Sequence, residues 1–508
     1  MPTYASALQL HQAILSGQTT AVQALDETYA RIDATEPVLN AYNSLCKALA
    51  YEAAKTVDAK VAAGESLPLL AGVPVAIKDN LNLTGTPTTC SSKMLGNESY
   101  VSPYNATVCD RLNAHLMPIV GKTNLDEFAM GSSTENSAFG PSKNPWDPAR
   151  VPGGSSGGAA ATVASRQVLL SLGSDTGGSI RQPAALCGVV GIKPTYGLVS
   201  RYGLVAFASS LDQIGPFAVD VEDAAALLEV LAGYDPMDST SHKALAQAPE
   251  QTRYSEQLAQ LSKTSLAGVR IGVIQELSGE QAQGFDPEVM AAFEASIAQL
   301  KALGADIKTV SVPSVKYGVA AYYIVAPAEA SSNLARYDGL RYGLREPGAQ
   351  DLGSLFKKTR AAGFGPEVKR RIMLGTFALS AGYYDAYYGK AQRVRQLLRH
   401  EFNQAWQQVD ALICPTSPCT AFKFGEKSSD PLQMYLSDVA TIPVNLAGIP
   451  ALSVPCGFDA NHMPIGLQIQ GPHWSELKLL QIARAYEHAA GFKGKQPNLD
   501  ALKTPANV

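Results

Sequence analysis

Two serines in glycine-rich segments, Ser155 and Ser179, are the residues of this chain best placed by type and spacing for covalent chemistry. They lie 24 positions apart within residues 151–183, "VPGGSSGGAAATVASRQVLLSLGSDTGGSIRQP". A serine hydroxyl is a poor nucleophile at neutral pH, so it needs a base within hydrogen-bond reach. No histidine lies in or near this segment, so the base must be another group.

A histidine-based site of the α/β-hydrolase kind is disfavoured. Gly153, Ser155 and Gly157 fit the pattern G-x-S-x-G, but that motif requires a buried strand directly before the serine. Residues 141–152 are rich in proline and polar residues and are typical of a loop. The seven histidines lie in helical or polar contexts, where a lone histidine is more often structural than catalytic.

A lysine base is the alternative, and Lys78 is the candidate because it ends a β-branched run at residues 71–79. A helix over 157–166 advances about 15 Å and a strand over 168–172 returns about 16 Å, which would bring Ser155 and Ser179 close together. If the two strands are neighbours, a neutral Lys78 could take a proton from Ser155, which in turn takes one from Ser179. From the residues alone, a flexible Gly-Ser turn and a surface lysine remain the competing interpretation.

Glycines before Ser179 also favour acyl chemistry. Gly177 and Gly178 leave backbone N–H groups bare next to the serine, where they could form an oxyanion hole. A second glycine-rich candidate, "GKTN" at 121–124, fails as a phosphate loop because Leu116 occupies the position of its first glycine.

Composition excludes several classes of function. The 508 residues carry a formal net charge of −4, which argues against a broad nucleic-acid-binding face. Seven cysteines, from Cys46 to Cys456, form no CxxC pair and match no disulfide framework or zinc site, so we expect reduced thiols and no bound metal. Residues 1–17 show no basic n-region followed by an apolar stretch, as a signal peptide would, and the sequence has no uncharged apolar run of about 18 residues. We therefore expect a cytoplasmic protein without a membrane contact.

Hydrophobic periodicity predicts an α/β fold. Helical patterns cover residues 5–17, 20–37 and 46–64, and another from residue 106 leads into a strand at 116–120. Residues 236–267 are polar and indicate an insertion or boundary, after which short apolar runs at 268–276, 411–415, 450–455 and 464–471 alternate with helical patterns. Length alone leaves the number of domains open.

Three segments together resemble the amidase signature family: "VAIKDN" at 75–80, "GGSSGG" at 153–158 and "GSDTGGSIRQPAALCGVVGIKPTYG" at 173–197. Members of that family use a Ser–cisSer–Lys triad. The resemblance implies that Ser179 is the acyl-forming nucleophile, Ser155 the bridging serine after a cis peptide bond from Gly154, and Lys78 the base. It also implies that Thr176, Gly177 and Gly178, with Ser179, supply the oxyanion-hole amides.

Further segments, at 200–218, 329–343, 369–395 and 438–457, are similar to the A subunits of glutamyl-tRNA(Gln)/aspartyl-tRNA(Asn) amidotransferases. In that family the A subunit hydrolyses glutamine and passes ammonia to a B subunit. The B subunit uses ATP and Mg²⁺ to activate a misacylated tRNA, and a small C subunit braces the pair. The resemblance implies a heterotrimer, with no cofactor in this chain and tRNA contacted mainly by the B subunit. The sequence leaves open whether Glu-tRNA(Gln), Asp-tRNA(Asn) or both are amidated.

The same resemblance implies one α/β/α domain over residues 1–508, with a mixed central sheet and helices on both faces. Its parts would be N-terminal helices at about 1–65, a signature core at about 66–220, the polar insertion at about 236–267, and the rest of the sheet in 268–508. Two residues depart from the family pattern. His115 stands where a small residue is usual, and Ala159 stands where a serine is frequent.

A glutamine pocket must balance one α-carboxylate and one α-ammonium, because burying either charge unpaired is costly. Arg371 and Asp438 match the family's glutamine-binding residues and carry the required charges, and Tyr322 is a third match that the sequence does not separate from Tyr323. Two rival functions stay open: a stand-alone amidase for small or aryl amides, and a non-catalytic scaffold. A scaffold would be supported by a missing triad residue, but all three are present.

Overall fold

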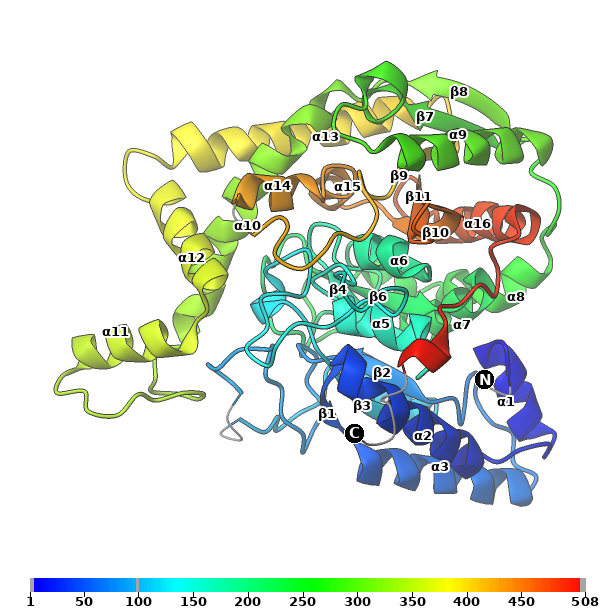
Figure 1. Ribbon diagram of the computed structural model, residues 1–508, viewed down its shortest axis with the longest axis horizontal. Helices are drawn as coiled ribbons and strands as arrows, with labels where there is room; N and C mark the ends of the chain where they lie inside the picture. Colours follow the sequence, from blue (N-terminus) through cyan, green and yellow to red (C-terminus); the bar gives the residue numbers. More distant parts are fainter. Residues whose placement is uncertain (1–3, 97–99, 429, 503–508) are drawn as a thin grey trace.

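The computed structural model describes residues 4–96, 100–428 and 430–502, and its strands form one mixed eleven-stranded sheet (Figure 1). The strand order is β1-β3-β2-β4-β6-β5-β10-β11-β9-β7-β8. The strands are β1 Tyr42–Leu45, β2 Val75–Lys78, β3 Ile119–Thr123, β4 Leu170–Asp175, β5 Val190–Lys193, β6 Gln213–Ala218, β7 Arg270–Ile274, β8 Asp306–Val310, β9 Ala411–Pro415, β10 Ala451–Phe458 and β11 Pro464–Gln470.

The helices cover both faces of this sheet, which confirms the predicted α/β class. Strand β2 is parallel to β3 and β4, and β7 is parallel to β8 and β9, whereas the remaining pairs are antiparallel. The α-helices are α1 Ala7–Leu15, α2 Ala21–Leu39, α3 Lys47–Ala62, α4 Thr107–Ala114, α5 Gly157–Ala164, α6 Arg181–Cys187, α7 Val221–Leu231, α8 Tyr254–Ala259, α9 Pro287–Ala302, α10 Gly318–Asn333, α11 Leu352–Gly363, α12 Pro366–Ala378, α13 Lys390–Ala405, α14 Pro431–Leu436, α15 Ile442–Ala447 and α16 Glu476–Ala490.

The three predicted N-terminal helices are confirmed as α1, α2 and α3. Helix α2 starts at a capping box, in which the Thr20 side chain accepts from Gln23 N and the Gln23 side chain accepts from Thr20 N. The strand predicted at 116–120 begins later, at Ile119, because Leu116 has a left-handed backbone conformation with φ of 55°.

Strands β2 and β4 are hydrogen-bonded neighbours in parallel register, with Val75 opposite Leu170. This confirms the adjacency on which the lysine hypothesis depends. Helix α5 lies between Ser155 and β4, as predicted, although β4 starts two residues later than the apolar run suggested and extends to Asp175.

Two segments lie outside the sheet. Residues 236–267 contain short helical turns and α8, and no strand. Helices α11 and α12 project beyond the sheet at the left of Figure 1, with α12 packed against α10. None of the described helices is both long and apolar enough to cross a membrane.

Candidate active site

Lys78 lies at the carboxyl end of β2 with its side chain fully buried. Its Nζ atom is 2.7 Å from Ser155 Oγ, 2.8 Å from Ser156 Oγ and 3.0 Å from Ser174 Oγ. The partners of the Lys78 amine are thus serine hydroxyl groups rather than a carboxylate. The structure therefore brings together two of the three predicted triad residues in direct contact.

Burial lowers the pKa of Lys78 to about 7, although the charges of Asp126, Asp175 and Asp212 act in the opposite direction. A neutral amine at physiological pH has a free lone pair, and its partner hydroxyl can then donate to it. The geometry and the electrostatics both favour Lys78 as an acceptor of the Ser155 proton.

Ser179 lies beside this pair at the more accessible end. Its backbone oxygen accepts a hydrogen bond from Ser156 N at 3.2 Å, which places it next to Ser155 in space. The residue is 7% exposed, whereas Lys78 and Ser155 are 0% exposed. The peptide bond between Gly154 and Ser155 is cis, which confirms the expectation from the sequence. These exposures fit Lys78 as a buried base, Ser155 as a buried bridging serine and Ser179 as the serine that a ligand can reach.

The backbone before Ser179 has donors with no protein acceptor. Within the described residues, the N–H groups of Thr176, Gly177 and Ser179 make no hydrogen bond to the chain. The N–H of Gly178, which was also expected in the oxyanion hole, donates to Asp175 Oδ1 at 2.8 Å. Gly178 has a φ of 143°, which a residue with a side chain rarely adopts.

Asp175 holds this loop through Arg181. The Arg181 guanidinium donates to both carboxylate oxygens of Asp175 at 3.0 Å, and both side chains are fully buried. Burial alone would raise the pKa of Asp175, but the ion pair with Arg181 lowers it to about 2. The loop is thus anchored by a pair that is ionised at neutral pH.

Asp438 and Tyr322 lie against the same loop. A side-chain carbon built on Gly178 would stand 3.2 Å from Asp438 Oδ1, and one built on Gly177 would stand 2.8 Å from the Tyr322 ring. Ser132 donates to Asp438 Oδ2 at 2.5 Å, whereas Oδ1 is buried with no partner in the described part of the chain. Burial raises the pKa of Asp438 to about 7 despite the Ser132 hydrogen bond. A buried carboxylate oxygen without a donor fits a cationic ligand group.

Arg371 is buried on the inner side of α12, and its Nε atom donates to Glu367 Oε1 at 2.8 Å. Its Cζ atom lies 5.1 Å from the Tyr323 ring centroid and 5.6 Å from that of Tyr435. Tyr322 and Tyr323 meet edge to face at 5.1 Å. The two tyrosines that the sequence could not separate thus occupy different places: Tyr322 faces Gly177, and Tyr323 faces Arg371.

Sequence reasoning missed several polar neighbours of these residues: Asn80, Ser132, Ser156, Ser174 and Glu367. Serines in a Gly-Ser loop carry no periodic signal, so Ser156 could be found only by its position next to Ser155. Glu367 was detectable as the residue four positions before Arg371 on a predicted helix.

Three residues outside the serine-lysine centre that stand out in the sequence have structural roles. Lys122 of "GKTN" is fully buried in an ion pair with Asp79 at 3.1 Å. His115 ends α4, with its Nδ1 atom 3.0 Å from the Leu69 carbonyl oxygen. Ala159 is buried within α5. Among the described residues, no group of three or more His, Cys, Asp or Glu residues is arranged to hold a metal ion.

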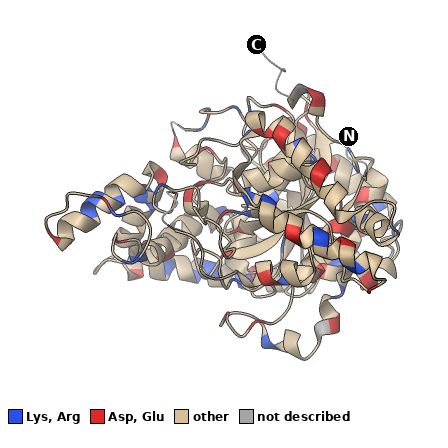
Figure 2. Cartoon of the chain, turned by 90° about the horizontal axis from the view of Figure 1, so that it is seen from below, with Lys and Arg blue, Asp and Glu red and all other residues tan. Residues whose placement is uncertain are grey.

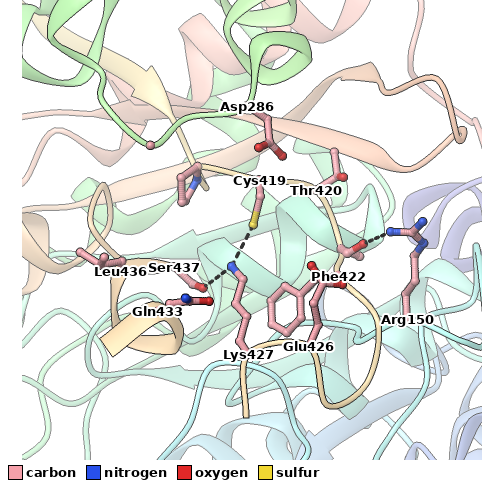
Figure 3. Close-up of a pocket in the computed structure, with 13 residues that line it drawn as sticks. Arg150, Asp286, Cys419, Thr420, Phe422, Glu426, Lys427, Gln433, Leu436 and Ser437 are labelled. Atoms are coloured by element: carbon pink, nitrogen blue, oxygen red, sulfur yellow. Dashed lines mark hydrogen bonds between the residues drawn. The ribbon is translucent and has the colours of Figure 1, made fainter. Parts of the chain in front are cut away.

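A cavity of about 350 Å³ lies next to the Asp438 segment (Figure 3). Lys427 points into it and donates to Ser437 Oγ at 3.0 Å and to Cys419 Sγ at 3.2 Å. Neither Lys78 nor either candidate serine lines this cavity, so it is separate from the serine-lysine centre.

Comparison with known proteins agrees with this geometry. Residues 23–480 match the Amidase family. Curated proteins from Picosynechococcus sp. and Microcystis aeruginosa, both named as the A subunit of glutamyl-tRNA(Gln) amidotransferase, are each 59% identical over 96% of this chain and are covered over 99% and 98% of their own lengths.

Solved structures show the same similarity. The crystal structure of the A subunit of glutamyl-tRNA(Gln) amidotransferase from Thermotoga maritima is 44% identical, with a TM-score of 0.73 over 93% of each chain. The peptide amidase from Stenotrophomonas maltophilia is 29% identical, with a TM-score of 0.81 over 98% of this chain and 99% of its own. The fold, the serine-lysine geometry and these matches together place the chain in the Amidase family.

Proposed function

We propose that this chain is the glutamine-hydrolysing A subunit of a tRNA-dependent amidotransferase. The observation that carries the proposal is the contact between the buried Lys78 amine and Ser155 Oγ, beside Ser179. The buried side chains of Arg371 and Asp438 supply one charge of each sign. The names and the full-length similarity of the relatives support the same function.

In the proposed mechanism, neutral Lys78 takes the Ser155 proton while Ser155 takes the proton of Ser179. Ser179 Oγ attacks the side-chain amide carbon of glutamine, and the N–H groups of Thr176, Gly177 and Ser179 stabilise the resulting oxyanion. The proton held by Lys78 returns through Ser155 to the leaving nitrogen, and ammonia departs. Water, deprotonated along the same relay, then hydrolyses acyl-Ser179 to release glutamate.

The substrate zwitterion would be held at both of its charges. Asp438 Oδ1, which has no donor in the described structure, would accept the α-ammonium, and the Arg371 guanidinium would bind the α-carboxylate. Tyr322 would form the wall next to Gly177. Each charged group of glutamine thus meets a partner, as a buried site requires.

The ammonia would be used by a partner. We infer assembly with a B subunit, which uses ATP and Mg²⁺ to activate the misacylated tRNA, and with a small C subunit. Glu-tRNA(Gln) is the proposed acceptor, with Asp-tRNA(Asn) as a second one. The chain would act as a single domain in the cytoplasm, and its seven unpaired cysteines fit a reducing compartment.

The test is Ser179→Ala in the assembled complex. We expect glutamine hydrolysis and glutamine-dependent tRNA amidation to be lost, because the proposed mechanism forms its acyl intermediate on Ser179 Oγ. Amidation with added ammonium salt should stay at the wild-type rate, since it bypasses this site.

Two results would contradict the proposal. Residual glutamine hydrolysis above a trace in Ser179→Ala would show that the nucleophile is another residue. Efficient hydrolysis of small or aryl amides by the isolated wild-type chain, with no response to glutamine, would identify a stand-alone amidase instead.

A further inference from the structure

The Arg371 guanidinium is held on one edge only. Its side chain is 3% exposed, and Nε is the one nitrogen that donates to a protein acceptor within the described residues. An arginine carries four further N–H donors on Nη1 and Nη2, arranged as a planar fork. This fork is the edge that could bind a carboxylate with two parallel hydrogen bonds.

Glu367 is the residue that holds the other edge. It lies one helical turn before Arg371 on α12, and its own side chain is 10% exposed. Besides the bond from Arg371 Nε, Oε1 accepts from Tyr435 Oη at 3.1 Å, and Oε2 pairs with Arg370. Three donors thus fix the position of this carboxylate.

The same carboxylate connects three helices around the site. Tyr435 is on α14, three residues before Asp438, and its ring stacks on Tyr323 of α10 with centroids 3.7 Å apart. The Arg371 guanidinium lies beside both rings. A change at Glu367 would therefore remove the hydrogen bonds that link Arg371 to Tyr435 through this carboxylate, and would leave the guanidinium with its ring contacts alone.

We propose that Glu367 is a positioning residue that orients the Arg371 fork toward the α-carboxylate of the substrate. This inference rests on the proposed function, because it assumes that glutamine is the substrate. Glu367 does not touch the reacting atoms in this scheme. It acts through Arg371, so its loss should weaken substrate binding and leave the acylation chemistry at Ser179 intact.

The experiment compares two substrates in the assembled complex: glutamine and its α-carboxamide, which keeps the reacting amide and the α-ammonium but has no α-carboxylate. The variants are Glu367→Gln, which removes the charge, and Glu367→Ala, which removes the hydrogen bond as well. Glu27→Gln, which changes another i,i+4 Glu–Arg pair on the distant helix α2, is the matched control.

We expect the KM for glutamine to rise at least about tenfold in Glu367→Gln and further in Glu367→Ala, with kcat changed less than about threefold. The kcat/KM for the α-carboxamide should stay within about twofold of wild type, and Glu27→Gln should match wild type with both substrates. A milder variant, Tyr435→Phe, removes one donor to Glu367 and should raise the glutamine KM by about threefold.

A parallel loss of kcat with both substrates, or an unchanged KM for glutamine, would overturn the role of Glu367. Arg371→Met separates this failure from a failure of the proposed function. If Arg371→Met loses glutamine selectively but Glu367→Gln does not, only the positioning role is wrong. If Arg371→Met treats both substrates as wild type does, the proposed glutamine site itself is wrong.

Discussion

At the scale of single residues, two buried side chains of opposite charge type, Lys78 and Asp438, set the pH dependence that we predict. Burial lowers the pKa of Lys78 to about 7 and raises that of Asp438 to about 7. Below pH 7, Lys78 is protonated and cannot act as a base, while Asp438 is neutral and cannot hold an ammonium group. Both losses act in the same direction.

We therefore expect log kcat/KM for glutamine to fall with a slope of two below pH 7 and to level off above it. A neutral amide lacks the α-ammonium, so its profile should fall with a slope of one. Steady-state kinetics between pH 5 and 9 with both substrates checks this. Asp438→Asn should reduce the glutamine slope to one and leave the neutral-amide profile unchanged. A flat profile for the neutral amide would exclude Lys78 as the base.

At the scale of elements, the Asp175–Arg181 pair joins the end of β4 to the start of α6. Arg181 also donates to Gln468 Oε1 of β11 at 2.6 Å and to the Thr441 carbonyl oxygen, directly before α15, at 3.0 Å. One buried cation thus connects four elements around the Gly177–Gly178 loop. Removing it would leave the Asp175 charge buried and unpaired.

For Arg181→Met we predict a loss of about 3–5 kcal/mol in the free energy of unfolding, measured by urea denaturation. Arg253→Met is the control, because Arg253 and its partner Glu256 are both more than 60% exposed. That variant should change stability by less than about 0.5 kcal/mol. Equal effects of the two substitutions would show that the buried pair contributes nothing beyond a surface one.

Elements with a clear hydrophobic period could be predicted from the sequence, and those without one could not. The N-terminal helices and β2 follow their periodic patterns. Strand β6 was missed because Gly215 and Pro216 lie inside it, although it pairs with β4 and β5 in the middle of the sheet. Proline and glycine weaken a strand pattern in isolation, and only pairing on both sides overrides that preference.

The candidate site divides in the same way. Lys78 could be found because a strand visibly ends there, and the resemblance located Ser155 and Ser179. In the stretch "VKRRIM", charge alone predicts a solvated helix face, but the packing of α10 against α12, together with Tyr435 of α14, buries Arg371. Tertiary packing of this kind has no signal in the local sequence.

At the scale of the whole molecule, an apolar surface stands out along the carboxyl-terminal half of α12 and the segment that follows it. We define the α12 outer patch as Met373, Leu374, Phe377, Tyr383, Tyr384 and Tyr387, all of which are exposed. Its aromatic rings pack against one another, with 4.4 Å between the centroids of Phe377 and Tyr383. Met373 is 73% exposed. Protein interfaces are enriched in aromatic residues and methionine.

Charge is distributed unevenly around this patch. Residues 334–400 contain 13 Lys and Arg but only 5 Asp and Glu, although the whole chain has a net charge of −4. Figure 2 shows blue bands along the part of the chain that projects to the left, where α11 and α12 lie. A partner surface with an apolar centre and an acidic rim would fit here, and we predict that one of the proposed subunits presents it.

We predict that the double variant Met373→Asp/Phe377→Asp no longer binds the partner subunits, because it places two charges in the centre of the apolar patch. Affinity should fall about a hundredfold or more, as expected for interface hot spots. The measurement is co-purification of all three subunits from cells that co-express them, followed by titration of the isolated chain with the partner subunits.

Two controls show whether the effect is confined to assembly. Hydrolysis of a neutral amide by the isolated variant should equal wild type, since neither residue touches the serine-lysine centre. Leu15→Asp/Leu49→Asp, which changes two exposed leucines on α1 and α3, should assemble normally. Normal capture by Met373→Asp/Phe377→Asp, or equal loss in both double variants, would place the subunit interface elsewhere on the molecule.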